Sequence, residues 1–169
     1  RERGALLNKD NQYKEGLKTW IPYWRKNIHR FIMDYFGCSE LKPFQNILLW
    51  LMSRNIMFVY VASRGQGKSL LVSWFACAMA VLFPNIEIVI TSGTKGQAKL
   101  LVSTKIEKFA EKYPNLKKEI LKINRNSNEI VVVFKNGSTI TCVSPNDNSR
   151  GYRGNILIID EYRMVKKDI

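Results

Sequence analysis

A glycine-bearing loop and a pair of adjacent carboxylates are the features of this sequence whose residue types and spacing could do chemistry. The loop covers residues 62–69, Ala-Ser-Arg-Gly-Gln-Gly-Lys-Ser, between two apolar stretches. Gly67, Lys68 and Ser69 match the end of the pattern G-x-x-x-x-G-K-[ST], whereas Ala62 replaces its first glycine. The pattern predicts a turn between a strand and a helix that cradles the phosphates of a nucleotide.

The loop supplies the groups that phosphate binding needs. Backbone N–H groups from residue 64 to residue 69 can converge on phosphate oxygens at the positive end of the following helix. Gly65 and Gly67 permit backbone conformations that a Cβ atom would obstruct. We expect the Lys68 ammonium to reach the β- and γ-phosphates and the Ser69 hydroxyl to hold Mg²⁺. The predicted nucleotide-binding residues of the loop are Ser63, Arg64, Gly65, Gln66, Gly67, Lys68 and Ser69.

The carboxylate pair, Asp160 and Glu161, directly follows the apolar run 156–159. In open α/β sheets the ligand lies outside the carboxyl ends of the strands. We therefore expect Asp160 to bind Mg²⁺ through water and Glu161 to accept a proton from the attacking water. The competing interpretations are an ordinary strand–turn–helix joint for the loop and a solvated strand end for the carboxylates. Because both motifs are present and in the expected order, a nucleotide site is the favoured interpretation.

Four further polar side chains are candidates for contact with a nucleotide. Arg150 and Arg153 stand between glycines before the last apolar run, where a guanidinium could approach a γ-phosphate in cis or from a neighbouring subunit. Binding to nucleic-acid phosphates and solvation of a loop are the open alternatives. Arg64 could contact phosphate or sense its loss. The Gln45 amide could bind an adenine edge, but the residues alone favour an exposed Gln on an amphipathic helix.

The elements that must position these residues follow from periodicity and turn signals. The apolar run 56–62 is typical of a strand buried on both faces of a parallel sheet. Asn136-Gly137 between two β-rich runs predicts a hairpin. Strands are predicted over 56–62, 86–91, 129–134, 138–143 and 155–159, and helices over 19–36, 41–54, 69–83, 98–113 and 116–123. This order predicts an α/β fold of the P-loop type, with a mainly parallel sheet flanked by helices and a hairpin before the acidic strand.

Composition limits the classes of partner. The 27 Lys and Arg against 14 Asp and Glu give a net charge of +13, which favours nucleic acid over an anionic membrane or an acidic protein surface. A Lys-rich helix near residues 95–112 could follow a phosphate backbone, or could simply be solvated. Three well-separated cysteines and the single His29 disfavour a disulfide framework or a His metal site, and a reducing compartment is the default.

Together these motifs resemble the N-terminal ATPase domain of the large terminase subunit of tailed bacteriophages, over about residues 20–165. The segments that carry the resemblance are Leu41–Gln45, the loop 62–69, Ser149–Gly154, and Ile158–Glu161 followed by Tyr162-Arg163-Met164-Val165. Phosphate loops of that family commonly carry a Ser-Arg pair and lack the first glycine. The alanine at position 62 therefore favours this family over a generic phosphate loop.

The resemblance implies an additional-strand, conserved-glutamate P-loop fold that uses ATP and Mg²⁺ to drive double-stranded DNA into a capsid. It implies a ring of copies on the phage portal, a small terminase subunit as partner, and action in the cytoplasm of the infected bacterium. It makes Gln45 an adenine contact and Arg150 or Arg153 the arginine acting in trans. We expect an arm over residues 1–17 and an ATPase domain over 18–169. That domain is expected to be truncated after the acidic strand, with no coupling motif or nuclease domain.

Two rival functions remain open on the sequence. A two-lobed helicase would also have a Gln before its phosphate loop and a strand such as Ile90-Thr91-Ser92-Gly93-Thr94. Such helicases usually continue Asp-Glu with Ala-Asp or Ala-His, whereas Tyr162-Arg163 follows here. The other rival is a basic module that binds nucleotide and nucleic acid without turnover.

Overall fold

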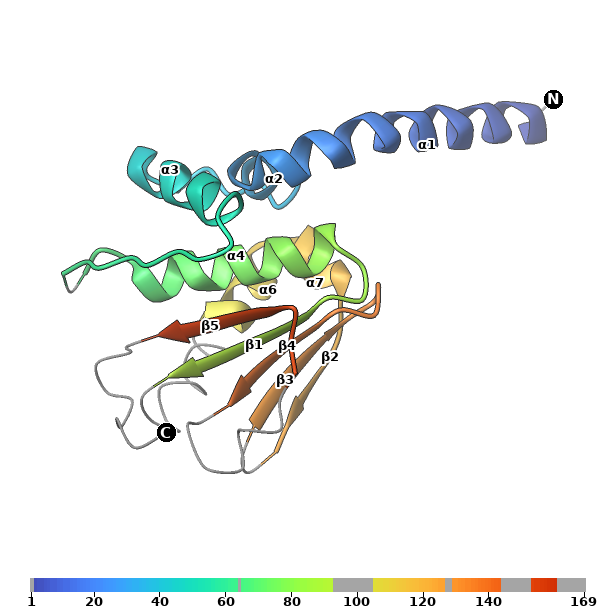
Figure 1. Ribbon diagram of the computed structural model, residues 1–169. Helices are drawn as coiled ribbons and strands as arrows, with labels where there is room; N and C mark the ends of the chain where they lie inside the picture. The colour runs from blue at the N-terminus through green and yellow to red at the C-terminus, as the bar shows by residue number, and fades with distance from the viewer. Residues whose placement is uncertain (1, 64, 93–104, 127–128, 144–152, 161–169) are drawn as a thin grey trace.

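A five-stranded sheet with helices on one face forms the body of the protein (Figure 1). The structure is a computed structural model that describes residues 2–63, 65–92, 105–126, 129–143 and 153–160. The strands are β1 Glu87–Ser92, β2 Ile120–Arg125, β3 Glu129–Phe134, β4 Thr139–Val143 and β5 Ile156–Asp160. Their order in the sheet is β2-β3-β4-β1-β5.

The sheet joins a parallel part to an antiparallel part. Strand β1 pairs in parallel with β4 and β5, whereas β3 pairs antiparallel with β2 and β4. The two parallel neighbours of β1 place the carboxyl ends of three strands at one edge of the sheet. The α/β fold class predicted from the sequence is confirmed, with an antiparallel part larger than the predicted hairpin alone because β2 extends it.

Strand β1 shows why its sequence folds as a central strand. Its residues are mostly β-branched, which suits a pleated surface packed on both sides. Ile88 and Ile90 are completely buried in the main core, and Val89 on the opposite face is 7% exposed. Hydrogen-bonded neighbours on both sides satisfy the backbone groups that burial removes from water. The predicted buried strand over 86–91 is therefore confirmed.

The hairpin predicted from Asn136-Gly137 is present between β3 and β4. The Gly137 N–H donates to the Phe134 carbonyl oxygen at 3.1 Å, and Gly137 takes a φ of +85° that an L side chain rarely adopts. Asn136 Nδ2 donates to the Ala80 carbonyl oxygen at 2.8 Å. The turn is thereby attached to the last turns of the helix that precedes β1.

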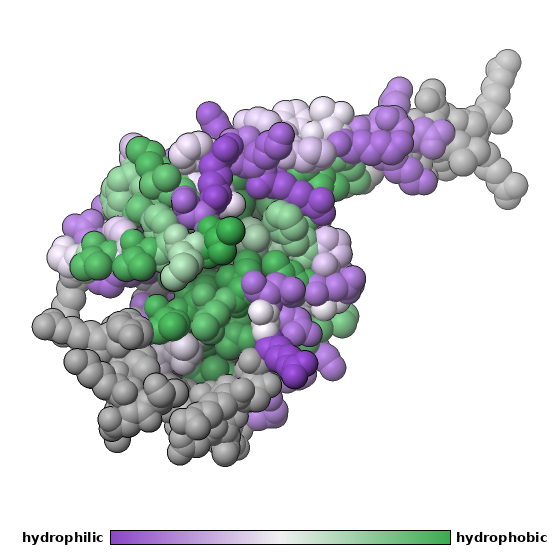
Figure 2. All heavy atoms as spheres, viewed as in Figure 1, coloured by the Kyte–Doolittle hydropathy of each residue, from purple (hydrophilic) through white to green (hydrophobic). Residues whose placement is uncertain are grey.

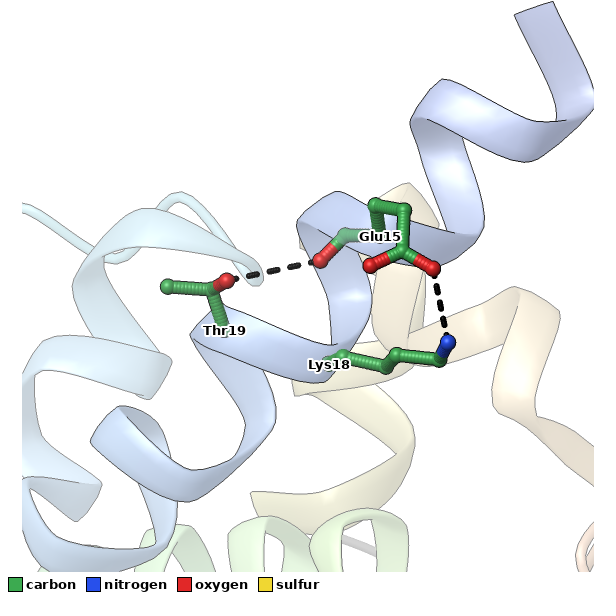
Figure 3. Close-up of polar contacts among 3 residues, drawn as sticks. All are labelled: Glu15, Lys18 and Thr19. Carbon is green, nitrogen blue, oxygen red and sulfur yellow. Dashed lines mark hydrogen bonds and ion pairs between the residues drawn. The ribbon is translucent and has the colours of Figure 1, made fainter. Parts of the chain in front are cut away.

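Helix α1 projects away from the body (Figure 1). The helices are α1 Glu2–Lys26, α2 Ile28–Asp34, α3 Pro43–Met52, α4 Lys68–Leu82, α6 Glu107–Lys112 and α7 Pro114–Glu119. On α1, Lys18 Nζ donates to Glu15 Oε1 at 2.6 Å and Thr19 Oγ1 donates to the Glu15 carbonyl oxygen at 3.4 Å (Figure 3). Such exposed contacts add little stability. The segment expected as an arm is therefore helical from Glu2 onward, and the helix predicted over 19–36 is interrupted at Asn27.

Helix α4 is the centre of the core. Its alanines Ala76, Ala78 and Ala80 are completely buried, and Trp74 is almost completely buried, between the sheet and the outer helices. Trp74 stacks on Phe109 of α6 with ring centroids 4.0 Å apart and contacts Phe36 at 5.7 Å. Stacked aromatic pairs stabilise a core beyond their buried area. No helix among the described residues is long and apolar enough to span a membrane.

The predicted strand over residues 56–62 is absent. The segment forms no helix or strand and runs between α3 and α4 (Figure 1), and it exposes Ile56 at 105% and Val61 at 90%. Figure 2 shows hydrophobic residues gathered over this part of the surface. A continuous apolar run indicates surface that could be buried, but a strand also needs hydrogen-bonding neighbours for its backbone. No described strand occupies that position beside it.

The helix predicted over 116–123 is also wrong in its second half. Helix α7 ends at Glu119, and residues Ile120–Arg125 form the edge strand β2 against β3. The Lys135 N–H donates to the Glu119 carbonyl oxygen at 2.9 Å, which attaches the junction to the hairpin. Pairing with β3 outweighs the short helical pattern, because strand formation depends on neighbours more than on local propensity.

The three cysteines are free and buried, as expected of small hydrophobic residues. Burial raises the pKa of the Cys142 thiol to about 12 and also raises the pKa of Cys77. A thiol with a raised pKa is a poor nucleophile at neutral pH. Cys77 and Cys142 therefore belong to the packing of the core.

Candidate nucleotide-binding site

The phosphate-loop residues lie at the N-terminus of α4. Gly67 is the N-cap of that helix with a φ of +75°, and its carbonyl oxygen accepts the Leu71 N–H at 2.9 Å. Gly65 also has a positive φ, +85°. Both glycines occupy backbone conformations that disfavour a side chain, as the loop pattern requires. The helix begins at Lys68, so its unpaired N–H groups and positive dipole end face the loop.

The two residues predicted to hold a cation meet in space although 91 positions separate them. Ser69 Oγ on α4 donates to Asp160 Oδ2 at the end of β5, at 3.2 Å. A hydroxyl and a carboxylate supply the oxygen ligands that Mg²⁺ prefers, and adjacent ligands of an octahedral Mg²⁺ lie about 3 Å apart. The residues therefore fit a magnesium ion, with Asp160 bound directly or through a water molecule.

Lys68 folds back over its own loop. Its Nζ donates to the carbonyl oxygens of Ala62 at 2.6 Å and Ser63 at 3.1 Å. An ammonium group has three donors and no acceptor, so phosphate oxygens are natural replacements for these carbonyls. The contact fixes the end of the exposed segment to the start of α4. It also holds a positive charge beside the loop.

Gln45 lies against the loop and is buried, which shows that the alternative of an exposed Gln is wrong. The side chain is 7% exposed, and its Oε1 accepts the Lys42 N–H at 3.0 Å as part of a capping box on α3. A Cβ atom placed on Gly67 would lie 3.0 Å from Gln45 Nε2. The amide is therefore held beside the loop with its orientation set by the helix cap.

The remaining predicted site residues are Arg64, Arg150, Arg153 and Glu161. Arg64, Arg150 and Glu161 lie outside the described residues. Arg153 is described and exposed, and it precedes the amino end of β5, whereas Asp160 ends that strand. The five-residue strand between them spans roughly 13 Å. Arg153 is thus at the opposite end of the sheet from the Ser69–Asp160 contact in its own chain.

Ser92 lies beside Asp160 and was not among the residues predicted from the sequence. It ends β1 and is the register partner of Asp160 in the neighbouring parallel strand. The side chain is 2% exposed, and its Oγ has no hydrogen-bond partner among the described residues. The signal in the sequence was a single hydroxyl closing an otherwise apolar strand at the carboxyl edge of the sheet.

The fold and the site together define a class. A parallel β4-β1-β5 sheet that places an acidic strand end against the N-terminus of a glycine-capped helix is an α/β fold of the P-loop type. The chain belongs to the terminase large subunit family of the T4likevirus type, because the model of the N-terminal part of that family matches residues 59–169. The resemblance stated from the sequence motifs is thereby confirmed.

A solved structure supports the fold. The chain is similar to the large terminase ATPase domain of Thermus phage P74-26, with a TM-score of 0.56 and 18% sequence identity. The match covers 79% of this chain and 58% of that one. At this identity the likeness is evidence for the fold alone. No curated protein matches the chain.

Proposed function

We propose that this chain is the ATPase domain of a DNA-packaging terminase motor, which binds ATP with Mg²⁺ and hydrolyses it to move double-stranded DNA. The observation that carries the proposal is the 3.2 Å contact between Ser69 and Asp160. Two motifs that are remote in the sequence supply oxygen ligands at one point, beside a helix N-terminus suited to phosphate. Family membership favours this reading of the site over a helicase lobe.

In this proposal the loop residues bind the triphosphate. The N–H groups at the start of α4 donate to phosphate oxygens, and Lys68 exchanges the carbonyls of Ala62 and Ser63 for the β- and γ-phosphates. A Mg²⁺ ion at this site would supply positive charge that offsets the charge of the phosphates. Ser69 and Asp160 would hold that ion, and Gln45 would contact the adenine edge next to the loop.

Hydrolysis needs two further groups that we assign from the sequence. Glu161 follows Asp160 directly and would accept a proton from the attacking water. Arg150 or Arg153 would supply a guanidinium to the γ-phosphate of a neighbouring copy in a ring. For Arg153, action in trans agrees with its position at the far end of β5 from its own loop. The net charge of +13 suits a double-stranded DNA substrate.

The partners of the whole protein follow from the same proposal. They are other copies in a ring, the phage portal and the small terminase subunit, in the cytoplasm of the infected bacterium. The chain spans 58% of the length of the solved terminase ATPase domain that it matches. Ring assembly and DNA translocation are therefore best tested in the full-length protein.

The binding step is tested by titration calorimetry with a non-hydrolysable ATP analogue and Mg²⁺. Ser69→Ala should lower affinity roughly ten- to hundredfold, because a contact to a charged group is worth about 1.5–3 kcal/mol. Ser73→Ala, one turn further along α4 and bonded to the Ser69 carbonyl oxygen at 2.7 Å, is the matched control and should bind as wild type. Equal affinity of all three proteins would contradict the site.

The catalytic step is tested separately in the full-length protein. Glu161→Gln should keep nucleotide affinity within about twofold but lower the hydrolysis rate by a factor of roughly 10²–10⁴, the contribution of general base catalysis. Phosphate release measures the rate. Undiminished turnover would remove Glu161 from its assigned role while leaving the binding site intact.

A further inference from the structure

The hydroxyl of Ser92 has no partner in a place where buried hydroxyl groups normally have one. We propose that Ser92 is a positioning residue of the cation site, whose hydroxyl holds the Asp160 carboxylate through one ordered water molecule when Mg²⁺ is bound. The inference rests on the proposed function, because it assigns a further residue to the same site. Its evidence is the burial, strand register and missing hydrogen bond of Ser92.

The register places Ser92 beside Asp160 on the same face of the sheet. The two residues are Cα partners in the parallel pairing of β1 with β5, and partners in adjacent strands point their side chains to the same side. Ile90 and Ile88, two and four residues earlier in β1, lie in the core on that face. The bond from Ser69 to Asp160 shows that the N-terminus of α4 covers the same face at this edge.

The missing partner distinguishes Ser92 from the other two buried serines of the described residues, whereas His29 Nδ1 and Asn46 Oδ1 also lack a partner there. Ser73 and Ser138 are also completely buried, and both of their hydroxyls are bonded. Ser73 Oγ donates to the Ser69 carbonyl oxygen at 2.7 Å, and Ser138 Oγ donates to the Phe83 carbonyl oxygen at 2.9 Å. Ser92 Oγ lacks any such bond in the described part of the chain. Most buried polar groups are satisfied, so an exception calls for a partner.

The chemistry of the site supplies that partner. A serine hydroxyl offers one donor and two acceptor positions, and a carboxylate accepts at both oxygens. With Ser69 engaged at Oδ2 of Asp160, a water molecule between Ser92 and the carboxylate would fix its orientation from the second strand. Groups that orient metal-binding carboxylates typically raise metal affinity without touching the ion. Ser92 is thus expected to act through Asp160.

The experiment measures cation affinity and stability in separate assays. Mn²⁺, which takes oxygen ligands as Mg²⁺ does, is titrated by electron paramagnetic resonance in the presence of a non-hydrolysable ATP analogue. Thermal unfolding is followed without cation or nucleotide. The variants are Ser92→Ala, the hydroxyl-preserving Ser92→Thr, and Ser138→Ala as a buried-serine control remote in the fold from Asp160. Ser69→Ala reports on the site itself.

Ser92→Ala should weaken Mn²⁺ binding roughly tenfold and leave the cation-free melting temperature unchanged or slightly raised, because no protein hydrogen bond is lost. Ser92→Thr should retain wild-type affinity. Ser138→Ala should show the reverse pattern, with a lower melting temperature and unchanged affinity. The two opposite patterns distinguish a residue that supports cation binding from one that supports stability of the fold.

Two results would overturn the inference alone. One is unchanged Mn²⁺ affinity in Ser92→Ala while Ser69→Ala weakens it, which leaves the proposed function intact. The other is a fall in the cation-free melting temperature of Ser92→Ala as large as that of Ser138→Ala, which would show that the hydroxyl has a partner within the protein. Absence of Mn²⁺ binding in the wild-type chain would overturn the proposed function and this inference together.

Discussion

Two apolar runs of similar length stand on either side of helix α4 and have opposite environments. The run before the helix, residues 56–62, is exposed and pairs with no described strand. The run after it forms β1, which lies between β4 and β5 and is buried at Ile88, Val89 and Ile90. Their compositions alone predict the same structure for both. The difference teaches that neighbours, and not hydrophobicity, decide which apolar run becomes a strand.

The backbone explains this difference. Strand β1 has hydrogen-bonded partners on each side, so burial leaves few of its N–H and C=O groups unpaired. At the end of the first run, the carbonyl oxygens of Ala62 and Ser63 accept hydrogen bonds from Lys68. That run thus contributes to the nucleotide-binding end of the molecule, while β1 contributes to the core.

The largest expected effect compares the same substitution in the two runs. Ile90→Ala should lower the free energy of unfolding by about 2–5 kcal/mol, because it opens a cavity beside α4. Ile56→Ala removes the same atoms from a side chain that is 105% exposed and should change stability by less than about 0.5 kcal/mol. Urea denaturation measures both. Equal losses would show that residue 56 is buried in solution.

Two of the elements predicted correctly have a local signal. Asn136-Gly137 specifies its own turn, and β5 follows from an apolar run closed by Asp160. The contact between Ser69 and Asp160 was also predictable. Ser69 lies at the start of a helix and Asp160 at the carboxyl end of a strand, and both positions fall at one edge of a parallel sheet. These features need only short-range chemistry and one topological rule.

The features that were missed depend on packing between distant segments. Gln45 is buried because α3 seats its capping amide against Gly67, and no pattern within α3 encodes that contact. Ile120 begins a strand because β3 offers it a neighbour. Ser92 becomes a candidate only because its register places it beside Asp160. In each case the deciding partner lies far away in the sequence.

The next expected effect compares two glycines with the same backbone conformation. Gly137 in the hairpin and Gly65 in the phosphate loop both have a φ of +85°. A Cβ atom on Gly137 would lie 2.2 Å from Asn85 Oδ1, whereas one on Gly65 would meet nothing within 4 Å. Gly65→Ala should therefore cost about 1–2 kcal/mol from backbone strain alone.

Gly137→Ala should cost more than Gly65→Ala by roughly 1 kcal/mol or above, because overpacking against Asn85 adds to the strain. Chemical denaturation of the two variants gives the difference directly. If the two substitutions proved equally destabilising, Asn85 would have moved away at little cost, and the hairpin would be less tightly held than β1 beside it.

The smallest expected effect is a dependence of the free energy of unfolding on pH, caused by His29. Burial lowers the pKa of His29 on α2, Arg30 lowers it further, and Asp34 opposes both. The unfolded imidazole, with a pKa near 6.5, therefore binds more protons than the folded one between the two values. The free energy of unfolding should fall as the pH drops through about 6.5.

His29→Gln should flatten this slope in denaturation at pH 5.5 and 7.5, because the variant side chain does not titrate. A slope that is the same in both proteins would mean that His29 is as well solvated in the folded chain as in the unfolded one, and that α2 packs more loosely than β1.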